Sequence, residues 1–456
     1  MAYPPHHLLR RATMPSLRAL ALGLSLVLAQ PAAQAMNLLQ VYEAALLQDP
    51  TLAAARAAAL AEGERVAMAR AQFYPNLSAS LSETRNDLTS TTPLLGKETV
   101  SHSNYPSRAK SISLRQPLYR PLLLAQLDQA QAQVRDAQGV LSSEAQNLAV
   151  RVAGSYFEVL LAQDQLELLL TQQSTLTTQL DAARKMFASG SGIRTDVDEA
   201  LARLDMNRAQ ELEARQHVSF TLQQLQALID EPIGQIVPLD ADRLQLQAPE
   251  PPQLQDWIER AYADNSQLRT LQARLESARF EIDKARTGHK PTVDAVAQWS
   301  DSESESVTNL NSRYRNNSFG VQMSVPLFAG GYVNAGVRQA LANAERAEKT
   351  LEAARRDTAL RVHQEFRAIT ENIAKLSALQ QALQSADQML ISTQKSFQAG
   401  SRTLVDIANA QQQKMAVLRD LARVRYVYLI ARIKLQSLVG AADLDAIGQV
   451  NQVLQP

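Results

Sequence analysis

The sequence predicts an α+β protein that contains one unit twice, in which long helical hairpins carry a few amphipathic strands. Three observations predict this class. A motif at residues 187–200 returns at residues 397–410, residues 122–189 and 334–399 contain no proline, and two pairs of segments alternate apolar with polar residues. Long proline-free stretches are typical of helices, and alternation with period two is typical of strands.

The repeated motif has the features of a tight turn between two helices. FASGSGIRTDVDEA at residues 187–200 aligns without a gap with FQAGSRTLVDIANA at residues 397–410. Each copy holds a glycine able to take positive φ, a hydroxyl side chain able to cap a helix, and an aspartate in the first helical turn. The glycines and aspartates are Gly190, Gly400, Asp196 and Asp406. We therefore expect residues 188–196 and 398–406 to be the tips of two helical hairpins.

The duplication extends far beyond these turns. Asp49-Pro50-Thr51-Leu52 is echoed at residues 264–268, and residues 116–119 align with residues 325–328 at a similar offset. A repeat of this length indicates an ancestral unit that was duplicated. The expected division is a leader at 1–35, a first repeat at 36–229, an equatorial linker at 230–253, a second repeat at 254–439 and an equatorial tail at 440–456.

The first 35 residues have the pattern of a secretory signal peptide. Three arginines precede an apolar run at residues 20–29, and the small-residue site Ala33-Gln34-Ala35 follows it. These are the three regions of an export signal, with cleavage expected before Met36. A membrane anchor is the alternative, but the apolar run is too short to span a bilayer. The sequence therefore predicts a product that is exported from the cytoplasm.

Each repeat is expected to begin with a helix that ends at a proline, at residues 37–72 and 254–287. The long helices at 122–189 and 334–399 would each extend roughly 100 Å at ~1.5 Å per residue. Their apolar residues fall on narrow stripes with steps of three, four and seven, such as Leu148, Val152 and Val159. This spacing is typical of a coiled-coil seam. The hairpins are therefore expected to be long coiled coils.

Four segments alternate as amphipathic strands do, at about residues 76–85, 109–118, 292–300 and 318–327. In the first, Leu77, Ala79 and Leu81 lie on one face and serines on the other. Strands of this length suit an outer-membrane β-barrel, although a soluble antiparallel sheet would alternate in the same way. The segments 86–108 and 301–317 are rich in Ser, Thr and Asn and are expected to be outward loops.

The strand count bears on the assembly. Four strands cannot close a barrel, and a sheet edge cannot be left open in lipid. The barrel must therefore be shared between protomers, with two chains supplying about eight strands and three supplying about twelve. We expect an α+β membrane protein that assembles around a common axis.

Composition and motifs exclude several classes of function. The chain has no cysteine, its six histidines are scattered, and its formal net charge is +0. These facts disfavour a thiolate or histidine metal site and a basic surface for nucleic acid. The sequence contains no G-x-S-x-G, H-E-x-x-H or P-loop motif. We therefore expect no catalytic residues, no cofactor and no metal, and a protein that is not an enzyme.

Several motifs together resemble the TolC-like outer-membrane efflux proteins. They are NLLQVYEAALLQDP near the start, AQFYPNLS before the first strand, and GSRTLVDIANAQQ followed by RDLARVRYVYLIARIKLQSLVG near the end. The resemblance covers about residues 36–442 and is strongest to the non-lipidated branch that serves type I secretion as well as drug efflux. The last motif is specific, whereas alanine-rich helices alone would be weak support.

This resemblance implies an export duct in the outer membrane that extends into the periplasm. It implies a homotrimer in which three chains build one shared 12-stranded β-barrel, set in outer-membrane lipid, and one periplasmic α-helical tunnel. A periplasmic adaptor protein and an inner-membrane ABC or RND transporter would open its entrance. A structural or adhesive coiled-coil assembly on the cell surface is the alternative, but it does not explain paired strands at a fixed place in each repeat.

The resemblance also assigns roles at the tips. The entrance constriction of the family is lined by acidic residues, and the two matching positions are Asp406 and Asn409. Because the second position is an asparagine here, we expect weaker cation binding at the mouth than two carboxylate rings would give.

A gate lock is the other role that the resemblance assigns. Arg402 matches the locking arginine, and Thr195 with Asp196 matches its partners. The aromatic hydroxyl of relatives is replaced by Phe397, so the lock would depend on the pair of Arg402 with Asp196. An exposed pair of this kind contributes only ~0.2–1 kcal/mol. The alternative is that Arg402, Asp196 and Asp406 only satisfy helix ends.

Overall fold

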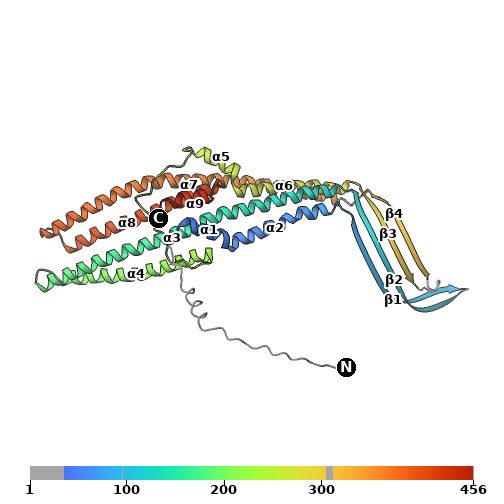
Figure 1. Cartoon of the computed structure of the whole chain (residues 1–456), viewed down its shortest axis with the longest axis horizontal. Coiled ribbons are helices and arrows are strands. Elements are labelled where there is room, and N and C mark those ends of the chain that lie inside the picture. Colours follow the sequence, from blue (N-terminus) through green and yellow to red (C-terminus); the bar gives the residue numbers. More distant parts are fainter. Residues whose placement is uncertain (1–34, 95, 305–311, 455–456) are drawn as a thin grey trace, which may run out of the picture.

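The computed structural model describes residues 35–94, 96–304 and 312–454. The expected signal peptide at 1–35 therefore lies almost entirely outside the described residues. Figure 1 shows a long rod of helices. At one end two helical hairpins extend in the same direction with their tips apart, and at the other end a sheet bends away from the rod.

The chain passes through the same order of elements twice. The first unit contains α1 (Leu38–Gln48), α2 (Pro50–Ala71), β1 (Asn76–Leu94), β2 (Lys97–Tyr119), α3 (Pro121–Ala188) and α4 (Arg194–Ile229). The second contains α5 (Leu254–Asp264), α6 (Ser266–Arg286), a 3₁₀ turn (Thr287–His289), β3 (Thr292–Ser304), β4 (Ser312–Ser324), α7 (Tyr332–Gln398) and α8 (Leu404–Leu438). A short helix, α9 (Leu444–Asn451), follows. This order agrees with a duplicated unit.

The expected single helices at 37–72 and 254–287 are wrong in one respect, because each is broken in two. The breaks lie at Asp49 and Asn265, whose backbone is extended, with φ −61° and ψ 118° or 121°. Each side chain accepts a hydrogen bond from the backbone N–H three residues on, at 2.8 Å and 3.0 Å. Such a side chain is an N-cap, so one residue ends the first helix and starts the second.

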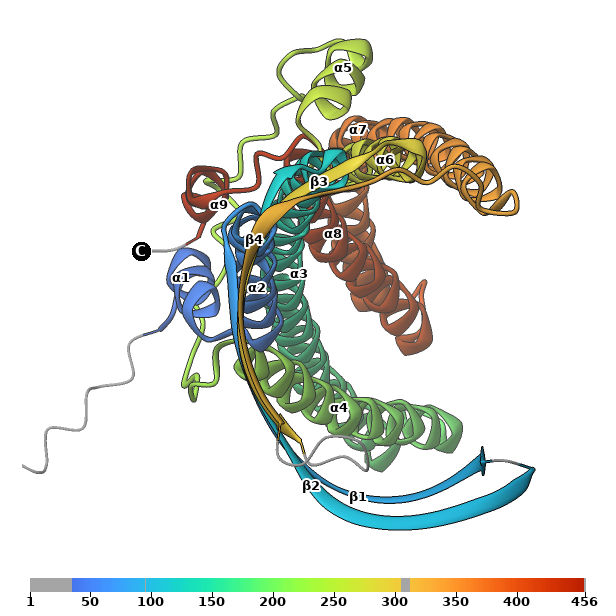
Figure 2. The same ribbon diagram turned by 90° about the vertical axis from the view of Figure 1, so that its right-hand side faces the viewer.

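The long helices have the expected length. α3 contains 68 residues and α7 contains 67, and neither is interrupted. α3 packs along α2, α4, α6 and α8, and thus links the two units. Figure 2, a view along the rod, shows the helices as one curved layer, and the sheet follows the same curve.

The hydrophobic core lies halfway along the rod. There α1, α3, α4, α8 and α9 bury large side chains such as Tyr156, Phe157 and Tyr428. The Tyr156 hydroxyl donates a 2.8 Å hydrogen bond to the carbonyl of Val237 in the linker. The linker in turn forms an isolated bridge to the tail through Leu239 and Leu454. Linker and tail therefore lie against the middle of the helices.

The sheet is antiparallel with the order β1-β2-β3-β4. The loop expected at 86–108 is wrong, because β1 continues to Leu94 and β2 begins at Lys97. The polar side chains of this segment pair with each other across the hairpin, as Thr89 and His102 do at 2.9 Å. The loop expected at 301–317 is wrong at both ends, because β3 reaches Ser304 and β4 begins at Ser312; residues 305–311 lie outside the described residues.

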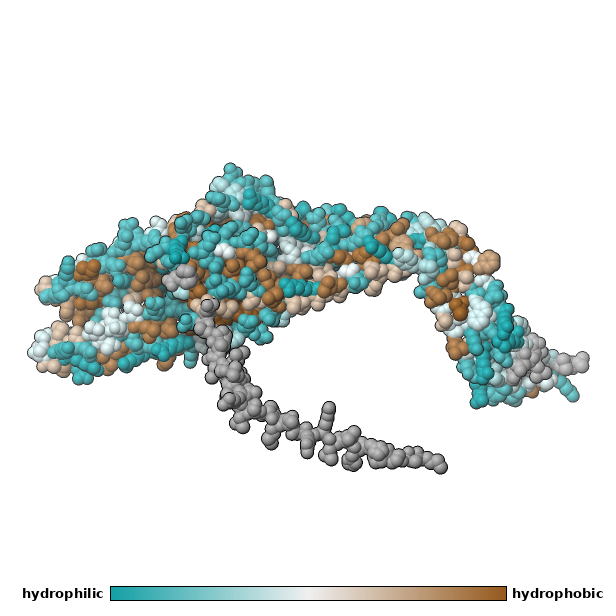
Figure 3. Space-filling model, viewed as in Figure 1, coloured by the Kyte–Doolittle hydropathy of each residue, from teal (hydrophilic) through white to brown (hydrophobic). Residues whose placement is uncertain are grey.

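The alternation of the strands places apolar residues on one face of the sheet. One row of paired residues on this face consists of Leu77, Leu114, Ala297 and Phe319. Two rows farther from the helices, the same face carries Leu81, Lys110, Asp301 and Arg315. Figure 3 accordingly shows brown patches on the part of the sheet near the helices and a hydrophilic surface beyond them.

No helix in the described residues combines the length and the hydropathy that crossing a membrane requires.

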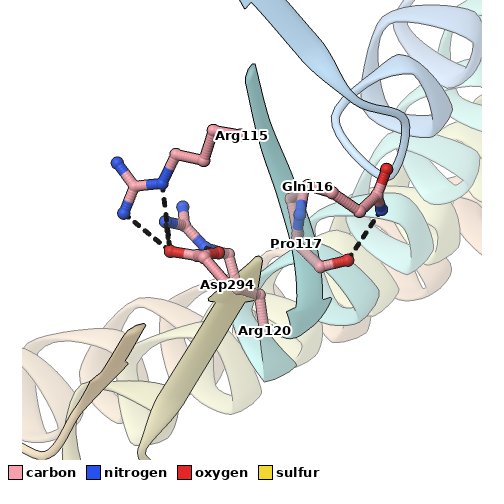
Figure 4. Close-up of polar contacts among 5 residues, drawn as sticks. All are labelled: Arg115, Gln116, Pro117, Arg120 and Asp294. Atoms are coloured by element: carbon pink, nitrogen blue, oxygen red, sulfur yellow. Dashed lines mark hydrogen bonds and ion pairs between the residues drawn. The ribbon is translucent and has the colours of Figure 1, made fainter. Parts of the chain in front are cut away.

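A buried carboxylate ties the sheet to the helices. Asp294 at the start of β3 has a side chain that is 3% exposed. Its Oδ2 lies 2.6 Å from Nη2 of both Arg115 in β2 and Arg120 next to α3 (Figure 4). Buried carboxylates need such partners because desolvation of an unpaired charge is costly. This cluster fixes the junction at which the sheet bends away from the rod.

Candidate functional site at the hairpin tips

The two hairpin tips have the same backbone geometry. Gly190 and Gly400 both have φ of 75°, a region that glycine enters without steric cost. In the first tip, the N–H of Ser191 donates to the carbonyl of Met186 at 3.0 Å. In the second, the N–H of Ser401 donates to the carbonyl of Ser396 at 3.0 Å. The two copies of the repeated motif thus fold into equivalent turns.

The second tip starts α8 with a capping box. The Thr403 hydroxyl accepts a hydrogen bond from the N–H of Asp406 at 3.2 Å. The Asp406 carboxylate accepts bonds from the N–H and the hydroxyl of Thr403 at 2.8 Å and 2.9 Å. These hydrogen bonds, first of all the one from the backbone, hold the pKa of Asp406 below its usual value of 3.8. Asp406 is therefore ionised at neutral pH while it also stabilises the helix end.

Arg402 contacts Asp406 within its own tip. Its Nη1 lies 3.5 Å from Oδ1 of that carboxylate, four residues on. Among the described residues, no ion pair or hydrogen bond joins Arg402 to Asp196 or Thr195, which lie at the start of α4 in the other hairpin. The expected lock is thus not formed inside one chain, and a lock between neighbouring chains remains a prediction. The half-buried Phe397 lies near the end of α7, next to the second tip. Its carbonyl accepts a hydrogen bond from the Gly400 N–H at 2.9 Å.

The first tip relies on charged side chains. α4 has no side-chain cap at Ile193. Arg194 pairs instead with Asp198 at 3.1 Å, and Asp196 lies in the first turn, where a negative charge is favourable. Asp196 thus lies where a negative charge stabilises the start of α4.

Asn409, the other expected constriction residue, has a partner that sequence reasoning missed. Its side-chain oxygen accepts a 3.1 Å hydrogen bond from Nη2 of Arg203 in α4. The same nitrogen donates to Glu199 at 2.7 Å. The spacing of Glu199 and Arg203 by four residues suggests their pairing, but nothing in the sequence indicates that the guanidinium reaches the other hairpin.

Two further contacts join the hairpins farther from the tips. Gln411 in α8 donates to the Thr175 hydroxyl in α3 at 3.2 Å, and the Tyr426 hydroxyl donates to Asp164 at 2.7 Å. Burial raises the pKa of both Asp164 and Tyr426. The hairpins of one chain are thus held together by a short series of polar contacts along α8.

The contacting side chains at the tips are polar or charged, and most of them pair with one another. They are carboxylates, guanidinium groups, amides and hydroxyls. The described residues contain no group of three or more His, Cys, Asp or Glu side chains that could hold a metal ion. Such an arrangement can hold two helical hairpins together and release them.

Comparison with known proteins agrees with this geometry. The profile of the family described as "Outer membrane efflux protein" matches residues 41–230 and 257–441. The alkaline protease secretion protein AprF of Pseudomonas aeruginosa is 32% identical over 94% of this chain and 90% of its own length. The proteases secretion protein PrtF of Dickeya chrysanthemi is 31% identical over 93% of each chain.

A solved structure shows the same fold. The outer membrane protein VceC of Vibrio cholerae superposes with a TM-score of 0.72 at 16% identity, over 89% of this chain and 96% of VceC. The family match covers most of the chain and both of its repeats, and it confirms the resemblance found in the sequence motifs. The chain belongs to the outer membrane efflux protein family.

Proposed function

We infer that this outer-membrane protein is an export duct, in which the sheet crosses the membrane and the helical rod extends into the periplasm. The observation that carries this inference is a four-stranded sheet with two free edges and an exposed apolar face, joined to long helical hairpins. Phe319 on that face is 93% exposed in the single chain. Apolar side chains so exposed require lipid or another chain around them.

The assembly follows from the free edges. β1 and β4 each pair on one side only within the described chain. An unpaired strand edge in lipid leaves backbone groups without hydrogen bonds, which costs several kcal/mol per group. We propose that β1 of one chain pairs with β4 of the next, so that three chains close a 12-stranded barrel. The curved layer of helices in Figure 2 would then form one third of a tunnel wall.

Exposed apolar side chains on the rod support the same assembly. Leu60 and Met68 of α2 are 76% and 65% exposed in the single chain. A neighbouring protomer packed along α2 would cover them, because contact between chains removes such side chains from water. The homotrimer thus explains exposed surface on both the sheet and the rod.

The partners and cargo belong to the proposal as well. A duct without its own energy source needs a pump, and we propose an inner-membrane ABC or RND transporter with a periplasmic adaptor protein. AprF and PrtF are named for the secretion of proteases, so we propose a secreted protein as the main cargo. Small molecules are the second candidate, since the family description refers to efflux.

The tips are proposed as the gate. Asp406 and Asn409 would line the entrance, and Arg402 would meet Thr195 and Asp196 of an adjacent hairpin in the trimer, with Phe397 beside them. A net contribution of ~0.2–1 kcal/mol for such an exposed pair would let a docking partner release it.

Ion conductance in a planar lipid bilayer tests the duct. Purified protein inserted from one side should give discrete, equal current steps at an applied voltage. A surface assembly without a pore would give no steps. Arg402→Ser should raise the conductance by loosening the closed state, and unchanged conductance would contradict the assigned lock.

A further inference from the structure

We propose that Arg203 is a positioning residue of the gate, because its hydrogen bond to Asn409 ties the two hairpins of one chain together just behind their tips. The proposal rests on the proposed duct. It concerns a contact inside each protomer, whereas the lock expected at Arg402 would join adjacent chains.

The contact has a definite geometry. Nη2 of Arg203 in α4 lies 3.1 Å from Oδ1 of Asn409 in α8. The Arg203 side chain is 26% exposed, so it is partly shielded from water. A hydrogen bond with a charged donor is stronger than a neutral one, and partial shielding strengthens it further.

Glu199 aims the guanidinium at Asn409. Its Oε1 accepts bonds from both Nε and Nη2 of Arg203, at 3.2 Å and 2.7 Å. Because Glu199 precedes Arg203 by four residues on one helix, the pair can form whether or not the hairpins touch. The guanidinium is therefore held in place before it meets α8, and less side-chain freedom is lost when the hairpins close.

The position of the contact gives it its role. Of the hydrogen bonds and ion pairs between the two hairpins in the described part of the chain, this one lies nearest the tips. The next are Gln411 with Thr175 and Tyr426 with Asp164, progressively closer to the core. Figure 1 shows the tips themselves apart from each other. If the α7–α8 hairpin swings away from α3–α4 to open the entrance, the bond of Arg203 to Asn409 must break first.

Substitutions at the two positions should have opposite effects. Arg203→Ala removes the donor and should favour the open state. Asn409→Asp replaces a neutral acceptor with a carboxylate, so the contact becomes a charged pair and should favour the closed state. In the double variant the new carboxylate has no guanidinium to meet, so the closing effect of Asn409→Asp should disappear.

The experiment compares single-channel conductance of the full-length protein in planar bilayers for the wild type, the two single variants and the double variant. Arg208→Ala is the matched control, since Arg208 lies on the same helix and, among the residues that the structure describes, pairs only with Asp205, at 3.2 Å. We expect Arg203→Ala to raise the open fraction about fivefold, which corresponds to about 1 kcal/mol. Arg208→Ala should leave it unchanged.

The dependence of the open fraction on salt concentration distinguishes an ion pair between Arg203 and the new carboxylate from a general effect of the substitutions on folding. The closing effect of Asn409→Asp should weaken from 0.1 M to about 1 M salt, because an exposed ion pair is screened. Heat unfolding should be the same for Arg203→Ala and Arg208→Ala, since both are surface charges on α4. A lower unfolding temperature for Arg203→Ala together with an unchanged open fraction would indicate a purely structural role and contradict the proposal.

Three outcomes overturn the proposal in distinguishable ways. If the wild type conducts but Arg203→Ala behaves like Arg208→Ala, the tie is not part of the gate and the duct stands. If Asn409→Asp lowers the conductance equally with and without Arg203, its charge acts on the pore and not through the pair. If the wild type forms no channel at all, the duct fails and the gate role of Arg203 fails with it.

Discussion

The hydroxyl of Tyr426 in α8 donates a 2.7 Å hydrogen bond to the carboxylate of Asp164 in α3. Tyr426 is 2% exposed, and its ring lies 5.9 Å from that of Phe157. The bond therefore joins the two hairpins at the edge of the central core, where neither group has ready access to water. It is the inner end of the series of contacts whose outer end is Arg203 with Asn409.

Tyr426→Phe should destabilise the protein by ~1–3 kcal/mol, because it leaves the partly buried carboxylate of Asp164 without its donor. The ring, and with it the packing, is kept. Thermal unfolding of the detergent-solubilised protein, followed by circular dichroism, measures the change. Tyr262→Phe is the control, since that ring is 42% exposed and its hydroxyl has no hydrogen bond to the described residues. Equal unfolding temperatures for both variants would contradict the assigned bond.

Asp164 should also make stability depend on pH. Burial raises its pKa above the usual value of 3.8, so the folded state binds this proton more tightly than the unfolded state does. The stability that this proton contributes is complete below pH 3.8 and is lost as the pH rises through the folded-state pKa. Asp164→Asn keeps an acceptor but cannot ionise. The variant should therefore gain stability relative to the wild type between pH 4 and pH 7, and a constant difference would contradict the shift.

Gly139→Ala should push α3 away from α6. A Cβ at this position would lie 2.5 Å from Oγ1 of Thr270 and 3.2 Å from its Cα. Overpacking of this kind typically costs ~1–3 kcal/mol. Gly154→Ala in the same helix is the control, because a Cβ there meets nothing within 4 Å and alanine is the better helix former. Thermal unfolding should show a loss for the first variant and no loss for the second.

Asp406→Asn should reduce the block of the channel by multivalent cations at the entrance. The amide keeps an oxygen that can accept the Thr403 N–H bond, so the cap of α8 is largely retained while the charge is lost. Bilayer recordings with increasing trivalent cation measure the block. Asp420→Asn, at an exposed position on α8 farther from the tip, should leave the block unchanged. Block at full strength in Asp406→Asn would mean that this carboxylate does not line the mouth.

Much of the architecture could be predicted from the residues, because the two copies of the tip motif align without a gap and each copy contains its own turn signals. The proline-free stretches located α3 and α7 to within a few residues. Proline ends helices, and these stretches contain neither a proline nor another strong helix-ending signal before the tip glycines. The helix breaks at Asp49 and Asn265 were missed, although Asp49-Pro50 has the pattern of a cap followed by a first helical residue. Each break occupies a single residue whose side chain caps the next helix, so the helical segments on either side are nearly continuous in the sequence.

The remaining errors concern contacts between distant segments. Residues 86–108 are rich in Ser, Thr and Asn, residue types that are frequent in loops. In the structure, however, these residues belong to β1 and β2 and pair with each other across the hairpin. The tie of Arg203 to Asn409 depends on how α4 approaches α8, and no periodicity within either helix encodes that approach. Arg402, by contrast, was located at a tip correctly, yet its partner in the single chain is Asp406 and not Asp196.

The mass of the protein in detergent tests the central claim most directly. We propose that one chain cannot close its four-stranded sheet into a barrel or its curved layer of helices into a tunnel. Native mass spectrometry should therefore show a particle of three chains that persists at nanomolar concentration. A single, well-folded chain under the same conditions, with its apolar sheet face intact, would contradict the account.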